Sequence, residues 1–571
     1  MIKKGGGEKS SLNSPEPTIK SNLGLSDGKL LEILLNNDYL ERKEAEKILK
    51  YVKRQNLSLV SALLSKGLLT KDLLGQALAE YYKLPYADLN TNKPSRAQVL
   101  RLPESLAVKY RLVIYQVSGK EIVLATDQPK QKDLLAKIKE VIKQGQIKLA
   151  YSLPEDIDES LIHYRKSLKT RLQTILETTD RVAPEIIDQI IDDAVILMAS
   201  DIHLEPQAKE VVVRFRVDGV LREIGRLHKE YYSNILNRLK VQAHLRLDQH
   251  LAAQDGAIRF VRDHSVVDTR LSILPTLDGE KVVLRLLSAY VQDFTLNDLG
   301  LSPANQKLLL AAAKKPYGMI LVAGPTGSGK TTTLYALLKT LNKPEVNITT
   351  IEDPVEYRML NVNQIQVNSQ TNLTFAKGLR SIVRQDPDII LVGEIRDQET
   401  AEISVNAALT GHLLFSTFHA NDAATSVPRL LDMGIEPFLL ASTLNLIIAQ
   451  RLVRKICGHC RQSQVVSKAS LQKKYGQVSK FINQPKVTLY QGSGCEACGH
   501  TGYGGRTAIY EFISITPELE ELILKRPSTQ ELWRLAKQQG AKSLFEDGLI
   551  KVKNGQTTLE ELLRVVGLPS E

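Results

Sequence analysis

The sequence predicts an α/β protein that ends in a doubly wound domain and begins with smaller α+β segments. From about residue 300 onward, short apolar strands alternate with helical segments, which is the pattern of a doubly wound sheet. Between residues 211 and 287, β-prone runs follow one another, with a turn at Asp218-Gly219. Residues 28–82 instead repeat leucines at three- and four-residue spacing, which predicts helices.

These patterns divide the chain into four consecutive parts. The expected parts are a disordered Gly/Ser/Pro/Lys-rich tail (1–25), a small N-terminal module (26–165), a central α+β domain (166–290) and the final α/β domain (291–571). The last part contains two cysteine pairs within an insertion at about 455–500, and it becomes helical from about Pro517.

Composition excludes an integral membrane protein. The apolar fraction of 43% suffices for several cores, and the longest apolar candidate, Phe438 to Ala449, is broken by polar residues. Residues 1–14 have no apolar leader, so we expect a cytoplasmic protein. The net charge of +11 is spread along the chain, which favours a mixed solvated surface over a dedicated lipid or nucleic-acid face.

A phosphate-binding loop is the most specific pattern in the chain. Residues 324–331 fit G-x-x-x-x-G-K-[ST], with an apolar strand before them and a helix start after them. In that context the backbone N–H groups face a polyphosphate, Lys330 reaches its outer phosphates, and the Thr331 hydroxyl ligates Mg²⁺. The residues expected to bind ATP are Gly324, Pro325, Thr326, Gly327, Ser328, Gly329, Lys330, Thr331 and Thr332.

Carboxylates follow two further predicted strands. Glu394 ends the apolar run 389–392, but Gly393 stands where many phosphate-loop enzymes carry a Mg²⁺-binding aspartate. An acidic cluster of Glu352, Asp353 and Glu356 follows a strand at 347–350, where open α/β sheets build their sites. One of these carboxylates could deprotonate the attacking water, or the cluster could be a solvated loop.

Histidines and cysteines supply the remaining chemical groups. His412 and His419 stand at the two ends of an apolar strand, where each could sense a phosphate or serve structure. The four cysteines form two C-x-x-C pairs separated by 34 residues, which in a reducing compartment favours structural Zn²⁺ over disulfides. The expected zinc ligands are Cys457, Cys460, Cys495 and Cys498, with His459 and His500 as bystanders.

Several of these motifs together resemble the secretion ATPase family of type II secretion and type IV pilus assembly (GspE/PilB type). The resemblance covers the chain from about residue 28. The motifs that carry it, besides the phosphate loop, are residues 199–206 (ASDIHLEP), 213–219 (VRFRVDG), 350–357 (TIEDPVEY), 379–388 (LRSIVRQDPD), 393–397 (GEIRD) and 410–420 (TGHLLFSTFHA).

The resemblance implies a RecA-like ATPase domain preceded by a PAS-like central domain. It also implies an acidic Asp box (Glu352, Asp353, Glu356), a Walker B glutamate (Glu394) and a His box (His412, His419). Arginines of the central domain would complete the nucleotide site. Their candidates are Arg214, Arg216, Arg270 and Arg285, which the sequence does not rank.

The same resemblance implies a homo-hexameric, Mg²⁺-dependent ATPase motor at the cytoplasmic face of the inner membrane. Its implied partners are a membrane platform protein of the PilC/GspF type and a cytoplasmic docking protein of the PilM/GspL type. Membrane contact would then be peripheral and made through partners. The cysteine insertion and the large N-terminal module favour pilus extension or secretion over retraction, and the sequence leaves those two open.

The N-terminal module is expected to dock partners rather than to sense cyclic di-GMP. Family members that bind this dinucleotide carry a pattern of spaced leucines and glycines together with one arginine and one glutamine. Here the apolar positions Leu59, Leu63, Gly67, Leu74 and Leu78 fit it. Ser58, Val60 and Tyr81 stand where arginine, glycine and glutamine are expected, so the polar recognition groups are missing.

A nucleic-acid-stimulated RecA-like motor is the alternative function. Its support is the basic charge, the zinc site and the phosphate loop. Against it, basic residues are not clustered with aromatic ones, and aromatic residues make up 5% of the chain. We therefore expect no nucleic-acid partner.

Overall fold

The computed structural model describes most of the chain. It covers residues 25–568 apart from residues 56–58, 66–67, 90, 120, 132–133, 135–136, 139–145, 162–163, 165–181, 262–265, 288–293, 369, 483 and 496–497. The predicted disordered tail therefore lies outside the described residues, except for Leu25. The chain divides into two compact units, residues 1–171 and 172–571.

The first unit begins with a helical cluster, as the leucine spacing predicts. Its helices are α1 (Asp27–Asn36), α2 (Arg42–Gln55), α3 (Leu59–Ser65) and α4 (Lys71–Tyr82). The side chains of Ser26 and Thr70 cap α1 and α4 by accepting backbone N–H groups three residues on. Of the pattern considered for cyclic di-GMP, Leu59, Leu63 and Leu78 are fully buried in this core, whereas Ser58 and Gly67 lie outside the described residues.

A small sheet completes the first unit. Its strands are β1 (Leu112–Ser118), β2 (Glu121–Thr126) and β3 (Gln146–Tyr151), and its helices are α5 (Arg96–Val99), α6 (Glu104–Tyr110) and α8 (Pro154–Leu161). Strands β1 and β2 pair antiparallel, whereas β2 and β3 pair parallel. The predicted small α+β module is present.

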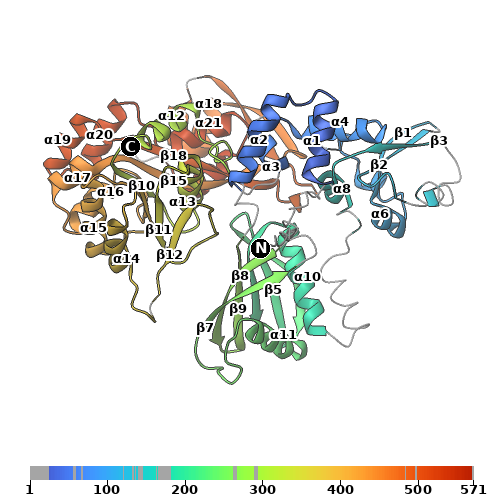
Figure 1. Cartoon of the computed structure of the whole chain (residues 1–571), viewed down its shortest axis with the longest axis horizontal. Coiled ribbons are helices and arrows are strands. Elements are labelled where there is room, and N and C mark those ends of the chain that lie inside the picture. The colour runs from blue at the N-terminus through green and yellow to red at the C-terminus, as the bar shows by residue number, and fades with distance from the viewer. Residues whose placement is uncertain are drawn as a thin grey trace, which may run out of the picture. The chain divides into compact units, whose positions relative to one another are not determined.

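A six-stranded antiparallel sheet, counted over the described residues, opens the second unit. In the order β6-β5-β4-β9-β8-β7, its strands are Val220–His228, Glu210–Val217, Ala199–Pro206, Gly279–Leu287, Val266–Thr276 and Gln254–Val261. Helices α10 (Val182–Ile196) and α11 (Lys229–Gln242) pack against each other and the sheet (Figure 1). The helical pattern expected from about residue 168 is described only from α10 onward.

The final domain is built on a seven-stranded sheet within the described residues. In the order β12-β11-β13-β14-β10-β15-β18, its strands are Val362–Gln366, Ile348–Glu352, Ile389–Val392, Leu413–Phe418, Gly318–Ala323, Leu444–Ile456 and Tyr503–Ser514. Neighbouring strands from β12 to β15 run parallel, and β18 adds to β15 antiparallel. The predicted doubly wound α/β domain is confirmed, with one antiparallel edge strand.

Strand β10 lies in the middle of this sheet and feeds two cores. All six of its residues are buried. Met319 and Leu321 belong to a core formed with α14 to α17, whereas Ile320 and Val322 belong to the core formed with α12 and α13. Both faces are therefore covered by helices, which explains why the strand is a continuous apolar run rather than an alternating one.

The helices of this domain follow the strands in the alternation that the sequence predicts. They are α12 (Pro303–Ala312), α13 (Lys330–Leu341), α14 (Phe375–Ile382), the 3₁₀ turn η3 (Val383–Gln385), α15 (Gln398–Leu409), α16 (Ser426–Asp432), α17 (Pro437–Thr443), α19 (Pro517–Leu524), α20 (Thr529–Gln538), α21 (Leu544–Lys553) and α22 (Leu559–Val566). The last four of these form the predicted helical C-terminus.

Between the cysteine pairs the chain forms a small excursion. It consists of β16 (Arg461–Ser467), α18 (Lys468–Tyr475), η4 (Gly476–Phe481) and β17 (Lys486–Gly492), with β16 and β17 paired antiparallel. The apolar stretch from Phe438 to Ala449 divides between α17 and β15. In the described part of the chain, no helix combines the length and the apolar character needed to cross a bilayer.

Glu511 is a buried carboxyl group that makes the stability of this domain depend on pH. It lies on β18, is 4% exposed and accepts the backbone N–H of Ala423 at 2.8 Å. Burial raises its pKa to about 7, against the opposing effect of N–H donors from Ala423, Leu544 and Ala424. Because the unfolded chain releases this proton at lower pH, the native state loses stability as pH rises toward 7.

Replacing Glu511 by glutamine should remove that pH dependence. Relative to wild type, Glu511→Gln should gain up to about 3 kcal/mol in free energy of unfolding between about pH 4.5 and pH 8. Urea unfolding at both pH values measures this change, with the exposed Glu521→Gln as the matched control. An equal effect of Glu511→Gln at the two pH values would contradict the assignment.

Candidate active site

The phosphate loop leaves the carboxyl end of β10 and enters α13. Its glycines are required by geometry: Gly324 (φ +152°), Gly327 (φ +77°) and Gly329 (φ +87°) all lie at positive φ. A Cβ on Gly324 would stand 2.6 Å from the Gln450 carbonyl oxygen, and one on Gly329 would stand 2.8 Å from Gln450 Nε2. The loop is therefore pressed against β15, and the predicted strand–loop–helix context is confirmed.

The polar groups of the loop fit a polyphosphate. Lys330 is 8% exposed, and its Nζ donates to the carbonyl oxygens of Gly324 at 2.8 Å and Pro325 at 3.0 Å. Burial lowers the pKa of Lys330, which the Glu394 carboxylate partly opposes. The buried Ser328 Oγ has no hydrogen-bond partner among the described residues. Together with the N-terminus of α13, these donors match anionic phosphate oxygens.

Glu394 lies just past β13 and contacts the side chains of Arg396 and His419. Its carboxylate is 12% exposed and lies 2.5 Å from the Arg396 guanidinium and 3.3 Å from His419 Nε2. His419 follows β14, the strand next to β13 in the sheet. The structure therefore brings together the Glu394 and His419 that the sequence singles out.

Gly393, in the position where an aspartate is common, lies against the neighbouring strand. A Cβ there would approach the Ile351 carbonyl oxygen and the Glu352 Cα at 3.2 Å each. The Gly393 carbonyl oxygen also accepts a 2.6 Å hydrogen bond from Thr417 Oγ1. A side chain at this position would need β11 to give by a few tenths of an ångström, so the close strand packing favours glycine over aspartate.

Glu352 is turned into the core rather than toward solvent. It is the last residue of β11, is 3% exposed, and accepts hydrogen bonds from Thr350 Oγ1 (2.6 Å) and the Tyr335 hydroxyl. Gln364 Nε2 donates at 3.5 Å. Burial raises its pKa, and these three donors oppose that rise. The Tyr335 hydroxyl also accepts the Glu356 N–H at 3.4 Å, so Glu352 supports the backbone that carries Glu356.

Glu356 is the more exposed carboxylate of the Asp box, and it meets an arginine of the central sheet. Its side chain is 41% exposed, whereas that of Arg270 is 28% exposed. Arg270, on β8, donates to Glu356 Oε2 at 3.2 Å and to the Val355 carbonyl oxygen at 3.3 Å. Asp353 lies on the exposed part of the same segment. Arg270 is thereby placed at the acidic cluster, and its role as an arginine that completes the nucleotide site stays a prediction.

The other candidate arginines are held within the central sheet. Arg270, Arg285, Asp201 and Arg216 face one another across four neighbouring strands, so they share one face. Asp201 binds Arg285 Nε at 3.0 Å and lies 3.5 Å from Arg216 Nε.

Arg214 is likewise paired inside the central domain, with the carboxylate of Glu205. Glu205 also binds Lys281 at 2.8 Å. In this conformation Arg214, Arg216 and Arg285 therefore satisfy carboxylates of their own sheet, whereas Arg270 reaches across to the Asp box.

His412 lies at the amino-terminal ends of the parallel strands, whereas the phosphate loop lies at their carboxyl ends. It precedes β14, its carbonyl accepts the N–H of Gly318 at the start of β10, and its Nδ1 lies 2.9 Å from the Ala407 carbonyl oxygen. The six residues of β14 separate it from His419 by about 20 Å. The structure thus does not bring His412 to the nucleotide loop, because a parallel sheet presents one end of each strand at the site.

Two residues beside the loop were missed by the sequence reasoning. Tyr335, on α13, joins Glu352 to the Asp-box backbone, as described above. Gln450, on β15, is 1% exposed and binds both the Ser328 carbonyl and the Thr333 hydroxyl. A glutamine directly after the apolar run 446–449 was a visible signal, because a buried amide needs partners.

The four cysteines converge on one point. Their sulfurs all lie within 4.8 Å of one another, including separations of 3.8 Å (Cys457–Cys495), 3.9 Å (Cys460–Cys498) and 3.7 Å (Cys495–Cys498). A tetrahedron of Zn–S bonds of about 2.3 Å places sulfurs about 3.8 Å apart. The N–H groups of Cys495 and Gly502 donate to Cys498 Sγ at 3.3 and 3.2 Å, which suits a thiolate. The donor set and its spacing are compatible with a tetrahedral metal ion.

A phosphate loop after β10, a glutamate after β13 two strands away and a mixed sheet with helices on both faces define a RecA-like ATPase of the phosphate-loop class. A family model described as type II/IV secretion system protein matches residues 177–564, and one described as MshEN domain matches residues 82–171. Because the first match spans most of the chain, the chain belongs to this family of secretion and pilus-assembly ATPases. The resemblance drawn from the motifs is confirmed.

Named relatives lie in both branches of the family. The chain is 38% identical to a type IV pilus assembly ATPase PilB of Thermus thermophilus over 88% of its own length and 58% of the relative's. It is 36% identical to PilB of Myxococcus xanthus over 94% of its length and 98% of the relative's. Identity to the type II secretion system protein E of Pseudomonas aeruginosa is 44%, over 73% and 82% of the two chains.

Among solved structures, the ATPase DotB of Legionella pneumophila shares the fold. The match has a TM-score of 0.50 at 20% identity and covers 67% of this chain and 96% of DotB.

Proposed function

We propose that the chain is an ATP-hydrolysing motor whose site is completed by the central domain. The observation that carries the proposal is the ion pair of Arg270 with Glu356, beside a sheet edge that also holds Lys330 and Glu394. This arrangement supplies a phosphate cradle, carboxylates that could bind water, and a guanidinium for developing negative charge. Those are the parts that phosphoryl transfer to water requires.

Each residue has a distinct role in this proposal. The loop N–H groups, Ser328 and Lys330 hold the phosphates, and the Thr331 hydroxyl would hold Mg²⁺, which neutralises charge on the transferring phosphoryl group. Glu394 orients and deprotonates water, with His419 at 3.3 Å fixing its carboxylate. Arg270 would exchange Glu356 for the γ-phosphate, which would leave Glu356 free to bind water.

The relatives support the process that such a motor would drive. They are named type IV pilus assembly ATPases and type II secretion proteins E, so the proposed work is assembly of a pilus or secretion pseudopilus. We further propose a homo-hexamer at the cytoplasmic face of the inner membrane, acting on a platform protein of the PilC/GspF type. Through the 26–165 module the motor would dock a partner of the PilM/GspL type.

The cysteine cluster is proposed to hold structural Zn²⁺. Four thiolates close a tetrahedron, so His459 and His500 are not needed as ligands. The site would join the start of the excursion at Cys460 to the segment that leads into β18. A metal here would therefore fix the excursion to the sheet.

Removing the loop lysine should abolish turnover. Lys330→Ala should lower the steady-state ATPase rate by on the order of 10²-fold or more, because the outer phosphates lose their buried cation. The exposed Lys343→Ala, just past α13, is the matched control. ATPase activity that survived Lys330→Ala would overturn the proposal.

Glu394→Gln should bind ATP without hydrolysing it. Fluorescence titration with an ATP analogue measures the binding.

Cysteine substitution should release the metal, whereas histidine substitution should not. Cys460→Ser should lose bound zinc, measured by atomic absorption on the purified protein, and should lower the melting temperature. His459→Ala, in the same C-x-x-C pair, should keep one zinc per chain. Full zinc content in Cys460→Ser, or loss of zinc from His459→Ala, would contradict the tetracysteine assignment.

A further inference from the structure

We propose that Asp218 is a positioning residue that docks the central sheet on the loop after the second cysteine pair. This loop, residues 499–506, runs from the residue after Cys498 into the start of β18, and we call it the knuckle loop. The contact would serve as the pivot from which Arg270 reaches the nucleotide site. The part that concerns turnover rests on the proposed function, whereas the contact itself can be tested without ATP.

Asp218 begins the two-residue turn between β5 and β6. Asp218 lies at φ +50° and Gly219 at φ +81°, which is the type I′ geometry of tight hairpins. The Asp218 Oδ2 accepts the Gly505 N–H at 3.0 Å, and its Oδ1 lies 3.6 Å from Arg506 Nε. Although it stands at a hairpin tip, the Asp218 side chain is only 13% exposed. The turn is therefore seated on the knuckle loop rather than solvated.

Strand β6 approaches the other end of the same loop. A Cβ added to Gly499 would stand 3.4 Å from Arg222 Nη1, so the guanidinium lies close to the residue that follows Cys498. Gly499 lies at φ +56°, a conformation that favours glycine. The β5–β6 hairpin thus contacts the knuckle loop at both of its ends.

The knuckle loop is tied to both cysteine pairs. The Gly502 N–H donates to Cys498 Sγ at 3.2 Å, and the Gly502 carbonyl oxygen accepts the Cys457 N–H at 2.9 Å. Thr501 Oγ1 also donates to the Cys498 carbonyl oxygen at 2.7 Å. A metal held by the four cysteines would therefore fix the loop on which the hairpin rests.

An irregularity in β18 makes the donor of this contact available. The pairing of β18 with β15 shifts register just before Arg506, which leaves Gly504 and Gly505 opposite the single residue Lys455. A bulge of this kind leaves one residue outside the regular ladder. The Gly505 N–H is therefore free to serve the Asp218 carboxylate.

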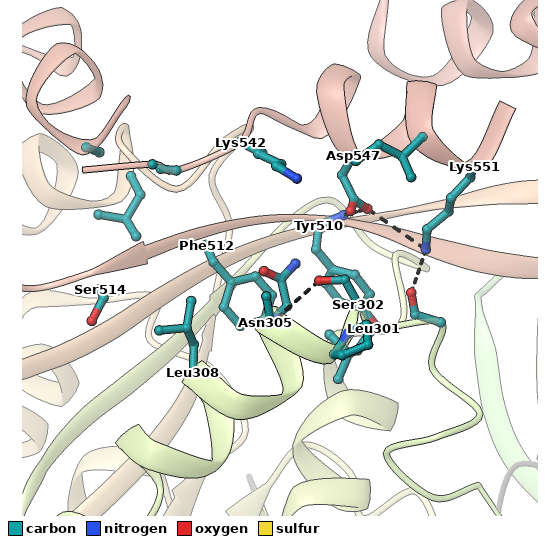
Figure 2. Close-up of a pocket in the computed structure, with 18 of the residues that line it drawn as sticks. Leu301, Ser302, Asn305, Leu308, Tyr510, Phe512, Ser514, Lys542, Asp547 and Lys551 are labelled. Atoms are coloured by element: carbon teal, nitrogen blue, oxygen red, sulfur yellow. Dashed lines mark hydrogen bonds and ion pairs between the residues drawn. The ribbon is translucent and has the colours of Figure 1, made fainter. Parts of the chain in front are cut away.

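Beyond the knuckle loop, β18 is anchored to α21. Lys551 Nζ donates to the carbonyl oxygen of Ala508, two residues past Arg506, and Asp547 accepts the Tyr510 N–H at 3.0 Å. Figure 2 shows Asp547 and Lys551 beside Tyr510, at a cavity of about 480 Å³. The β18 residues that line this cavity begin at Tyr510, so the cavity does not undercut the loop. The loop thus continues into a strand that is held in place.

The hairpin and Arg270 give the central sheet two separate contacts with the last domain. Arg216, two residues before Asp218, begins the row of facing residues that ends at Arg270 three strands away. Neighbouring strands lie about 4.8 Å apart, so the two contacts are separated by about 15 Å. A sheet held at one point can rotate about it, whereas a second contact sets its orientation. When Arg270 leaves Glu356 for a phosphate, Asp218 would keep the sheet in place.

Substitutions that keep the turn but weaken the contact test the proposal. Asn-Gly and Gly-Gly suit a type I′ turn as Asp-Gly does, so Asp218→Asn and Asp218→Gly should leave the hairpin intact. Hydrogen exchange on the full chain should be faster in residues 503–507 of both variants, and fastest in Asp218→Gly, which loses both acceptor oxygens. The same substitutions of Asp278, exposed in the β8–β9 turn, are the matched controls.

Turnover should fall in these variants although nucleotide binding does not. Each Asp218 variant should bind one ATPγS per chain with the wild-type Kd, because the phosphate loop is untouched. The kcat should fall by about threefold or more in Asp218→Gly and by less in Asp218→Asn. Loss of folded protein would instead lower the number of bound nucleotides together with kcat.

Three results would contradict the proposal. Wild-type exchange in residues 503–507 of Asp218→Gly, or equally fast exchange there in the Asp278 variants, would overturn the contact. A wild-type kcat in Asp218→Gly would overturn its role as a pivot. Wild type that hydrolysed no ATP would overturn the proposed function, and hydrogen exchange would still decide the contact.

Metal removal tests the link to the cysteine cluster independently. Dialysis of wild type against 1,10-phenanthroline should speed exchange in residues 503–507 and in the β5–β6 hairpin (216–222), because the knuckle loop loses its support. The β8–β9 turn (274–280) of the same sheet should be unchanged. Unchanged exchange in residues 216–222 of protein shown to be metal-free would overturn this link.

Discussion

The position of β10 is the constraint on which the rest of the site depends. This strand is buried at every residue between β14 and β15, and the phosphate loop starts at its carboxyl end. Because β11, β13 and β14 run parallel to it, their carboxyl ends deliver Glu352, Glu394 and His419 to the same edge. Because His412 precedes β14, the same strand direction places it at the opposite, amino-terminal ends of the strands. A binding site therefore follows from strand direction before any side chain is considered.

The candidate arginines differ in the carboxylates with which they pair. Arg214, Arg216 and Arg285 pair with Glu205 and Asp201 within their own sheet, so each would have to give up an existing ion pair to reach a nucleotide. Arg270 instead binds the partly exposed Glu356 of the other domain. A γ-phosphate can replace that carboxylate at low cost, since both are anionic oxygen acceptors for a guanidinium. In the proposed function, the Arg270–Glu356 pair would thus link nucleotide binding to the contact between the two domains.

The sequence predicts local features well because local spacing encodes them. The glycine loop, the two C-x-x-C pairs and the glutamate after an apolar strand each depend on residues close in the chain. The interiors of the strands and the helical C-terminus were also correctly predicted from periodicity. Residues that work across strands are different. Gln450 meets Ser328 over 122 positions, and Arg270 meets Glu356 over 86, so their partners depend on register and domain contact.

Two misleading patterns illustrate the same limit. His412 and His419 flank one strand and seem equivalent in sequence, yet the strand length separates them. Glu352 and Glu356 belong to one acidic cluster, but the first ends a buried strand and the second lies beyond it. In both pairs the deciding information is where the strand stops, which periodicity places only to within a few residues.

A double-mutant cycle on Arg270 and Glu356 tests the central claim most directly. The kcat of ATP hydrolysis is measured for wild type, Arg270→Ala, Glu356→Ala and the double variant. If the two side chains act as one unit, the double variant should be little slower than the slower single variant, with a coupling on the order of 1–3 kcal/mol. Losses that simply multiply would mean that the two residues act independently, whereas a wild-type kcat in Arg270→Ala would contradict a site completed by the central domain.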